Sequence, residues 1–214
     1  MSSRMHCHDE LLQDLDTYRE DDFVTEALLQ RWTLDSYSTS KHLFILYALA
    51  VGLKAKAICE IGAGRSSFAL LLAAKHNSGH LTMCDRYDYT ELFTDEEKKY
   101  VTYLNKQADV FWNEADTGLD FIFMDYLSTR KRDTNSCYKE IKKAYKMLKQ
   151  GGMIAIHDVC EDKYNAGSGL NLFRDKRGVE VLKVPFCYGL GLIRKTEASP
   201  YGKLDHKYEK KKDV

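Results

Sequence analysis

The stretch AICEIGAGRSSFALLLAA, residues Ala57 to Ala74, gives the first indication of the fold. It passes from a short apolar segment through Gly62 and Gly64 into a second apolar segment with helical spacing. A glycine turn between a buried strand and a helix lets the backbone come close to a bound group. Glu60 stands two residues before Gly62, so the turn combines an acid with two glycines. What this turn binds has to be inferred from the rest of the sequence.

The length and composition indicate one compact domain. The chain has 214 residues, enough to bury a core without disulfides or metal ions. Hydrophobic residues make up 44% and there are only two prolines, which favours a regular fold over a disordered one. We expect a single domain over residues 1–200, with leading helices from about 9 to 52 and a charged, mobile tail over 201–214.

Charge and cysteine usage restrict the partners and the compartment. Thirty-two basic residues balance thirty-two acidic ones, so no overall positive field favours nucleic acid. The six cysteines form no C-x-x-C pair, which is typical of reduced thiols. No apolar run has the length of a signal peptide or a membrane span. We therefore expect a cytoplasmic protein without a nucleic-acid or membrane partner, and the sequence leaves its oligomeric state open.

Short apolar runs alternate with helical segments along most of the chain. The runs predicted as strands are AICEIG, HLTMCD, DVFW, LDFIFMD, GGMIAIHD, VEVLKV and CYGLGLIRK. The helices predicted between them are SFALLLAAKH, DEEKKYVTYLNKQ and NSCYKEIKKAYKMLKQ, and an earlier helix, capped by Ser38 or Ser40, ends near Gly52. Only Pro185 and Phe186 separate the last two strands, so these form an antiparallel hairpin. The pattern predicts an α/β fold with a seven-stranded, mostly parallel sheet and helices on both faces.

Acidic residues follow the predicted strands at one edge of this sheet. The acids at or near the carboxyl ends are Glu60, Asp85, Asp125 and Asp158. Ligands of open parallel sheets bind beyond these ends, and a ring of carboxylates favours a cationic or hydroxyl-rich ligand over a pyrophosphate. Asp85 ends the second strand just over twenty residues after the glycine turn, where a carboxylate can accept both hydroxyls of a ribose.

At this point the sequence resembles the class I S-adenosylmethionine-dependent methyltransferases, which share a Rossmann-like sheet. EIGAG at Glu60 to Gly64 matches their glycine motif, Asp85 matches their ribose acid, and DFIFMD and LKQGGMIAIHD match their fourth and fifth strands. The resemblance covers roughly residues 41–195 and is closest to the small-molecule O-methyltransferases, both catechol-like and sugar- or antibiotic-tailoring. In two departures, Ser66 replaces the usual third glycine, and little room remains for a helix between DVFW and LDFIFMD.

The resemblance implies a cofactor, a reaction and a set of binding residues. The implied cofactor is S-adenosylmethionine, and its methyl group would pass to an oxygen of a small molecule, or alternatively to a nitrogen. The residues implied to bind the cofactor are Glu60, Gly62, Ala63, Gly64 and Asp85. Two other functions stay open: a NAD-dependent Rossmann oxidoreductase, which would favour a third glycine near Ser66, and a non-catalytic binding module with the same fold.

Asp125, His157 and Asp158 are the predicted catalytic residues at the reacting end of the pocket. In one interpretation the three residues hold a divalent cation such as Mg²⁺ or Mn²⁺, which lowers the pKa of an acceptor hydroxyl. In the other there is no metal, and His157 takes the proton of the acceptor directly. The resemblance places an acid–amide pair after the fifth strand, so the histidine at this position is itself a departure.

Overall fold

The structure is a computed structural model that describes residues 22–114, 117–127, 133–160, 165–174 and 176–196. Its strands are β1 Ala57–Ile61, β2 His80–Asp85, β3 Val101–Asn105, β4 Leu119–Met124, β5 Leu148–His157, β6 Val179–Val184 and β7 Leu190–Lys195. They form one seven-stranded sheet in the order β3-β2-β1-β4-β5-β7-β6. The pairs from β3 to β5 are parallel, whereas β7 is antiparallel to both of its neighbours. The predicted sheet and its terminal hairpin are confirmed.

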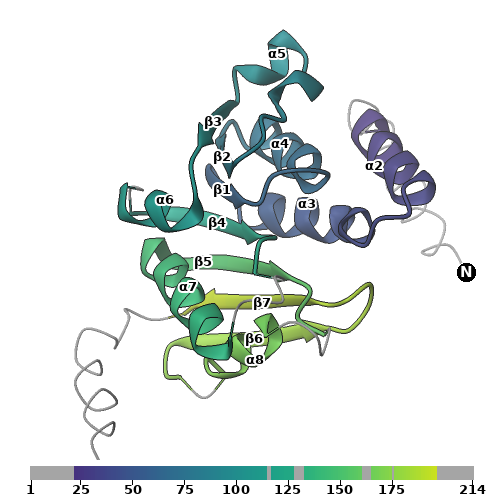
Figure 1. Ribbon diagram of the computed structural model, residues 1–214. Helices are drawn as coiled ribbons and strands as arrows, with labels where there is room; N and C mark the ends of the chain where they lie inside the picture. Colours follow the sequence, from purple (N-terminus) through teal and green to yellow (C-terminus); the bar gives the residue numbers. More distant parts are fainter. Residues whose placement is uncertain (1–21, 115–116, 128–132, 161–164, 175, 197–214) are drawn as a thin grey trace, which may run out of the picture.

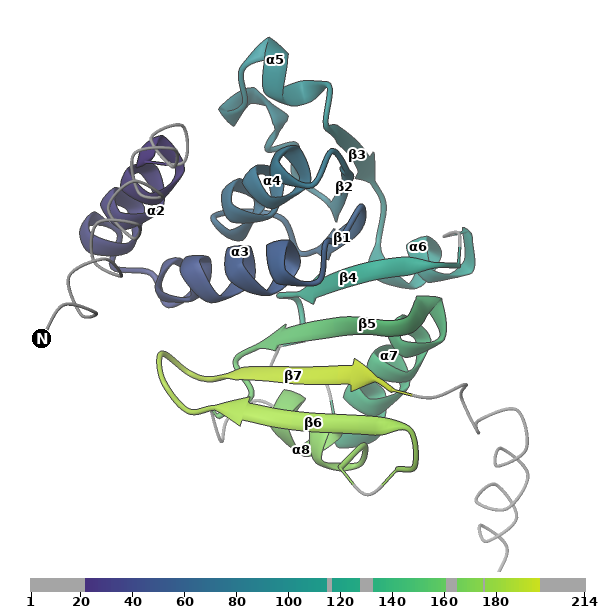
Figure 2. The same ribbon diagram turned by 180° about the vertical axis from the view of Figure 1, so that it is seen from behind.

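Helices cover both faces of this sheet, as Figures 1 and 2 show from opposite sides. The helices are α2 Asp22–Leu34, α3 Leu43–Gly52, α4 Ser66–His76, α5 Asp95–Lys98, α6 Ala108–Glu114, α7 Thr134–Met147 and α8 Ala166–Asn171. Two short 3₁₀ helices, η1 Thr39–His42 and η2 Thr90–Leu92, lie in the connections. One core cluster joins the sheet to α3 and α4, and another joins it to α6, α7 and α8.

The first core owes its packing to apolar residues with helical spacing. Leu46 and Ala50 of α3 and Leu70 of α4 are buried against Phe121 and Phe123 of β4. Phe121 and Phe123 are two residues apart, so they lie on the same face of the sheet, and Ile122 between them faces the other core. The central strands are therefore buried on both faces, which fixes their register and the positions of the residues that follow them.

The third strand was wrongly placed by the sequence pattern. DVFW lies within α6, and β3 is VTYLN, inside the segment expected to be a helix. The reason is that Phe111 and Trp112 of α6 are buried in the core, whereas β3 is an edge strand without a fully buried residue. With β3 ending at Asn105, α6 is the helix that seemed to be missing between the third and fourth strands.

Other expected boundaries shift by smaller amounts. Neither Ser38 nor Ser40 caps α3, because η1 precedes that helix and the Ser40 hydroxyl donates to Asp35 instead. Helix α7 ends at Met147, so the residues up to Gly152 already belong to β5. The first part of the expected leading helices, 9–21, and the tail over 201–214 lie outside the described residues.

Two further observations concern cysteines and hydropathy. The described cysteines are free thiols, and Cys59, Cys84 and Cys137 are buried as small apolar side chains. Cys7 lies outside the described residues. Within the described ranges, no helix combines the length and the apolar character that crossing a membrane requires.

Candidate functional site

Two cavities meet at the carboxyl edge of the sheet. The larger cavity, of about 720 Å³, is lined by Ile61, Gly62, Cys84, Asp85, Arg86, Tyr87, Tyr89, Lys106, Gln107, Ala108, Asp125, Tyr126 and Glu140. The smaller cavity, of about 500 Å³, is lined by Arg31, Asp35, Tyr37, Thr39, Ala63, Gly64, Arg65, Phe68, Tyr89, Phe93 and Asp125. Asp125 and Tyr89 line both, so the two cavities adjoin beside the end of β4. Gly62 lines the larger cavity and Gly64 lines the smaller one, so the glycine turn borders both.

The two glycines of the turn have different physical roles. Gly62 has φ +88°, and a Cβ there would lie 2.6 Å from the carbonyl oxygen of Asp125. Gly62 is therefore required by the close packing of the turn on the end of β4. A Cβ at Gly64 would meet nothing within 4 Å, and the Gly64 N–H donates to Ser67 Oγ over 2.9 Å. The open approach that a ligand needs is at Gly64, beside Ala63 in the smaller cavity.

Glu60 supports the turn from inside the protein. It is fully buried, and its two carboxylate oxygens accept hydrogen bonds from the hydroxyls of Ser66 and Ser67 at the start of α4. Burial raises the pKa of Glu60 to about 8, although the two serine hydroxyls act in the opposite direction. Ser66 thus has a partner at the position where a third glycine was expected. Glu60 lines neither cavity, and its predicted role towards a cofactor stays a prediction.

Asp85 lies where the sequence predicts it, at the end of β2 and in the wall of the larger cavity. Its Oδ1 accepts a hydrogen bond of 2.9 Å from the Tyr87 N–H, and its carbonyl oxygen accepts one of 3.0 Å from the Tyr103 hydroxyl. These two contacts fix the backbone and the carboxylate together. Because β2 pairs in parallel with β1, Asp85 at the end of β2 and Gly62 just after β1 lie at the same edge of the sheet, where both line the larger cavity.

Asp125, His157 and Asp158 form one compact cluster. His157 Nδ1 lies 3.0 Å from Asp125 Oδ1 and 3.2 Å from Asp158 Oδ1. The His157 side chain is only 3% exposed, whereas that of Asp125 is 21% exposed and lines both cavities. Burial lowers the pKa of His157, but the hydrogen bond and charge of Asp125, together with Asp158, outweigh burial and raise it. The three predicted residues therefore lie side by side, and of the three only Asp125 lines a cavity.

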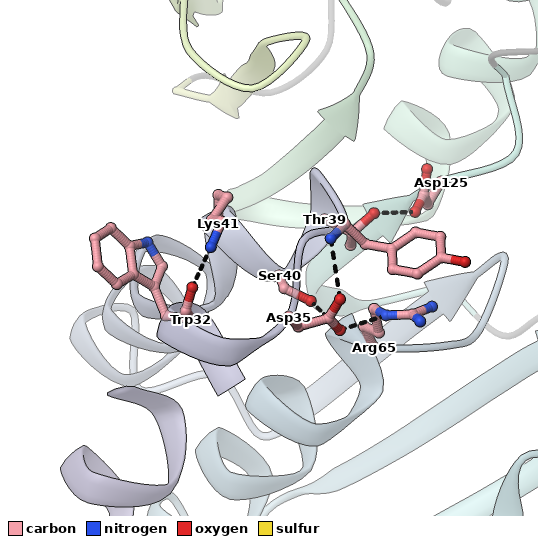
Figure 3. Close-up of polar contacts among 8 residues, drawn as sticks. Trp32, Asp35, Thr39, Ser40, Lys41, Arg65 and Asp125 are labelled. Atoms are coloured by element: carbon pink, nitrogen blue, oxygen red, sulfur yellow. Dashed lines mark hydrogen bonds and ion pairs between the residues drawn. The ribbon is translucent and has the colours of Figure 1, made fainter. Parts of the chain in front are cut away.

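Two residues of the segment before α3 complete this cluster. The Thr39 hydroxyl donates to Asp125 Oδ2 over 3.0 Å (Figure 3), and His157 Nδ1 lies beside Oδ1, so both oxygens of that carboxylate have partners. His42 packs edge-on against His157, with ring centroids 5.2 Å apart, and its Nε2 lies 3.2 Å from the carbonyl oxygen of Cys187. Because a carbonyl only accepts, this nitrogen of His42 carries the proton. Burial lowers the pKa of His42 to about 4, which keeps the imidazole neutral.

The cluster has the donor set of a divalent-cation site. One ligand atom each from Asp125, His157 and Asp158 lies within 4.8 Å of the others, which is close enough for all three to contact one ion. Two carboxylates and an imidazole suit Mn²⁺ better than Mg²⁺, which prefers oxygen ligands. The same distances also suit a proton on His157 Nδ1 that is shared between two carboxylates. The residues therefore fit a cation, and they equally form a cluster without one.

Sequence reasoning missed Thr39, His42, Asp35 and Arg65. The first three belong to the segment between α2 and α3, which carries no recognisable motif, and they reach the site only through folding. Arg65 stands inside the quoted motif but has no counterpart in its pattern. For these four residues the sequence contains no signal, because their position beside the cavities and the Asp125 cluster depends on which elements pack together.

Comparison with known families and structures agrees with this geometry. Residues 59–159 match the family described as a methyltransferase domain. This range begins in β1 and ends just after β5, so it contains the glycine turn, Asp85 and the Asp125 cluster. No curated protein sequence matches the chain significantly.

Solved structures share the fold at low sequence identity. A methyltransferase of Podospora anserina bound to S-adenosylhomocysteine has 17% identity and a TM-score of 0.57, over 80% of this chain and 88% of its own. The N-methyltransferase NodS of Bradyrhizobium japonicum, also bound to S-adenosylhomocysteine, has 17% identity and a TM-score of 0.57, over 80% and 98%. An O-methyltransferase of Bacillus cereus in complex with the same compound has 16% identity and a TM-score of 0.50, over 87% and 95%.

Proposed function

We propose that this chain, whose residues 59–159 match the methyltransferase domain family, transfers the methyl group of S-adenosylmethionine to an oxygen atom of a small molecule. The observation that carries the proposal is the pair of adjoining cavities at the carboxyl edge of the sheet. The larger has Asp85 in its wall, the smaller has Gly64, and Asp125 stands between them. The larger cavity suits an adenosyl group, and the smaller suits the methionyl group and the acceptor.

The chain's own residues bind and orient the cofactor. The Asp85 carboxylate would accept hydrogen bonds from the ribose hydroxyls, and the backbone of Gly62, Ala63 and Gly64 would contact the methionyl part. Glu60 acts beneath the turn by holding Ser66 and Ser67, and thereby fixes the backbone that the cofactor contacts. The bound sulfonium supplies an already activated methyl group, so the protein mainly has to align the acceptor and receive its proton.

Asp125 receives this proton in the proposed mechanism, since it is the member of the cluster that lines the cavities. His157 lies behind Asp125, orients the carboxylate through Nδ1 and balances its charge together with Asp158. In this proposal Asp125, and not His157, contacts the acceptor, because the His157 side chain is only 3% exposed. In the alternative mechanism, Asp125, His157 and Asp158 hold Mg²⁺ or Mn²⁺, which would lower the pKa of the acceptor hydroxyl.

Several observations support a methyltransferase over the other functions. Solved structures of the same fold contain S-adenosylhomocysteine, and they include both an O- and an N-methyltransferase. An oxygen acceptor is favoured because Asp125 and the neighbouring His157 offer a proton acceptor for a hydroxyl group. A NAD-dependent oxidoreductase would need a turn that cradles a pyrophosphate, whereas this turn lies over Glu60 and beside Asp125.

A methyl-transfer assay tests the proposed function. The wild-type chain is incubated with S-adenosylmethionine labelled in the methyl group and with a panel of hydroxylated small molecules. We expect Asp125→Asn to lose transfer, and Asp88→Asn, an acid that lines neither cavity, to keep it. Full transfer by folded Asp125→Asn would refute the role of Asp125. Cofactor binding without transfer to any member of the panel would instead favour a non-catalytic binding module.

A further inference from the structure

Arg65 places a positive charge directly after the glycine turn. It lines the smaller cavity together with Gly64, and its side chain is 42% exposed. The proposed mechanism leaves this charge without a role. A cation that follows the turn and lines a ligand cavity is a candidate for recognition of an anionic group.

The segment between α2 and α3 holds Arg65 in one orientation. Arg65 Nε donates to Asp35 Oδ2, and the guanidinium carbon lies 3.4 Å from the centroid of the Tyr37 ring. Asp35 is itself fixed, because it also accepts hydrogen bonds from Ser40 Oγ over 2.8 Å and from the Tyr37 N–H over 3.0 Å. The same segment reaches Asp125 through the Thr39 hydroxyl (Figure 3). The guanidinium plane is therefore set before any ligand binds.

Only part of the hydrogen-bonding capacity of Arg65 is used. A guanidinium has five N–H donors, and the contact with Asp35 is made through Nε. The two terminal nitrogens lie on the side away from Asp35, as Figure 3 shows. Within the described part of the chain, no other hydrogen bond or ion pair engages Arg65. Two terminal amino groups of this kind match the geometry of a carboxylate.

We propose that Arg65 binds the α-carboxylate of the cofactor's methionyl part, and that Asp35 and Tyr37 are positioning residues for its guanidinium. This inference rests on the proposed function. With the ribose held by Asp85 in the larger cavity, the methionyl part would extend past Asp125, which lines both cavities, towards the open face of Gly64 in the smaller cavity. Arg65 lines the same smaller cavity as Gly64, so the carboxylate end of the cofactor would lie beside the guanidinium.

Arg31 is the other arginine that lines the smaller cavity, and it serves as the matched control. Its guanidinium carbon lies 4.0 Å from the centroid of the Phe68 ring. Arg31 belongs to α2 rather than to the glycine turn, so it lies beside a part of the cavity that Phe68 of α4 lines. Substitution of either arginine by glutamine removes one positive charge from the same cavity. A general effect of charge would therefore be equal in Arg31→Gln and Arg65→Gln.

The test compares two ligands by calorimetry. S-adenosylhomocysteine carries the carboxylate, and its decarboxylated analogue, S-adenosyl-3-thiopropylamine, keeps the adenosyl group and the amine but lacks it. We expect Arg65→Gln to weaken the affinity for S-adenosylhomocysteine about 10- to 100-fold, as for the loss of a charge-assisted hydrogen bond. The affinity for the analogue should change less than about twofold in Arg65→Gln. Arg31→Gln should change the affinity for either ligand by no more than this. Asp35→Asn should reduce the preference for S-adenosylhomocysteine over the analogue. The double variant with Asp35→Asn and Arg65→Gln should lose no more of this preference than Arg65→Gln alone.

Three results would overturn the inference and leave the proposed function standing. Equal weakening of both ligands by Arg65→Gln would show a structural role, and unchanged affinities would show no role in binding. A loss specific to S-adenosylhomocysteine in Arg31→Gln, with Arg65→Gln unaffected, would assign the carboxylate to Arg31. If the wild-type chain bound neither ligand, the proposed function itself would fail, and this inference with it.

Discussion

Glu60→Gln should stabilise the protein, by an amount that grows as the pH rises. The pKa of Glu60 is raised from 4.5 to about 8 because the side chain is fully buried. A raised acid pKa means that the folded state favours the neutral form, so stability is lost as the pH rises from 4.5 through 8. At about 1.36 kcal/mol for each pH unit, the loss is at most roughly 5 kcal/mol, and about 3 kcal/mol at pH 7. Glutamine is neutral throughout and avoids this loss.

The hydrogen bonds of Glu60 make glutamine a close replacement. Its amide NH₂ can donate to Ser66 Oγ, and its carbonyl can accept from the Ser67 hydroxyl, in place of the two carboxylate contacts. Urea unfolding of the wild type and the variant at pH 5, 6, 7 and 8 measures the difference directly. Glu96→Gln, at an exposed acid, should show no such trend. A difference in unfolding free energy between Glu60→Gln and the wild type that stays constant or falls with rising pH would show that Glu60 does not titrate with a raised pKa in the folded state.

Three further predictions concern the binding residues and the reacting cluster. Asp85→Ala should weaken binding of S-adenosylhomocysteine by about 1–3 kcal/mol in calorimetry, and unchanged affinity in a folded variant would remove Asp85 from the ribose role. Gly62→Ala should lower the free energy of unfolding by at least about 1–2 kcal/mol, because of its positive φ and the contact with Asp125, whereas Gly64→Val should impair cofactor binding more than folding. Denaturant unfolding and calorimetry on both variants measure these two effects. A loss mainly of cofactor binding in Gly62→Ala and mainly of stability in Gly64→Val would contradict the prediction. Methyl transfer should persist in EDTA, because His157 Nδ1 already places an N–H donor between the carboxylates of Asp125 and Asp158. Activity that is lost in EDTA and restored by Mg²⁺ or Mn²⁺ would establish the cation instead.

The sequence contained most of the sheet, because burial leaves a direct pattern in the chain. The central strands β1, β4 and β5 are apolar on both faces and were located by that property. Strand β3 was missed because an edge strand is half exposed and its alternation is weak over five residues. Helix α6 was mistaken for a strand because its seven residues are too few to show a helical period around Phe111 and Trp112.

For the site, the sequence indicated residues at strand ends but not their partners. Asp85 and Asp125 were predicted because parallel strands bring their carboxyl ends to one edge. The contacts of Asp125 with Thr39 and of Arg65 with Asp35 join positions that are far apart in the chain, and such contacts depend on packing. The sequence also did not indicate that Glu60 is fully buried and accepts a hydrogen bond from Ser66 at the start of α4.

Calorimetric titration of the wild-type chain with S-adenosylmethionine, S-adenosylhomocysteine and NAD is the most direct test of the proposed cofactor. The acids Asp85 and Asp125 around the adjoining cavities predict that both methyl-cycle compounds bind and that NAD binds more weakly than either. Tighter binding of NAD, or binding of none of the three by the folded protein, would contradict the proposed methyltransferase function.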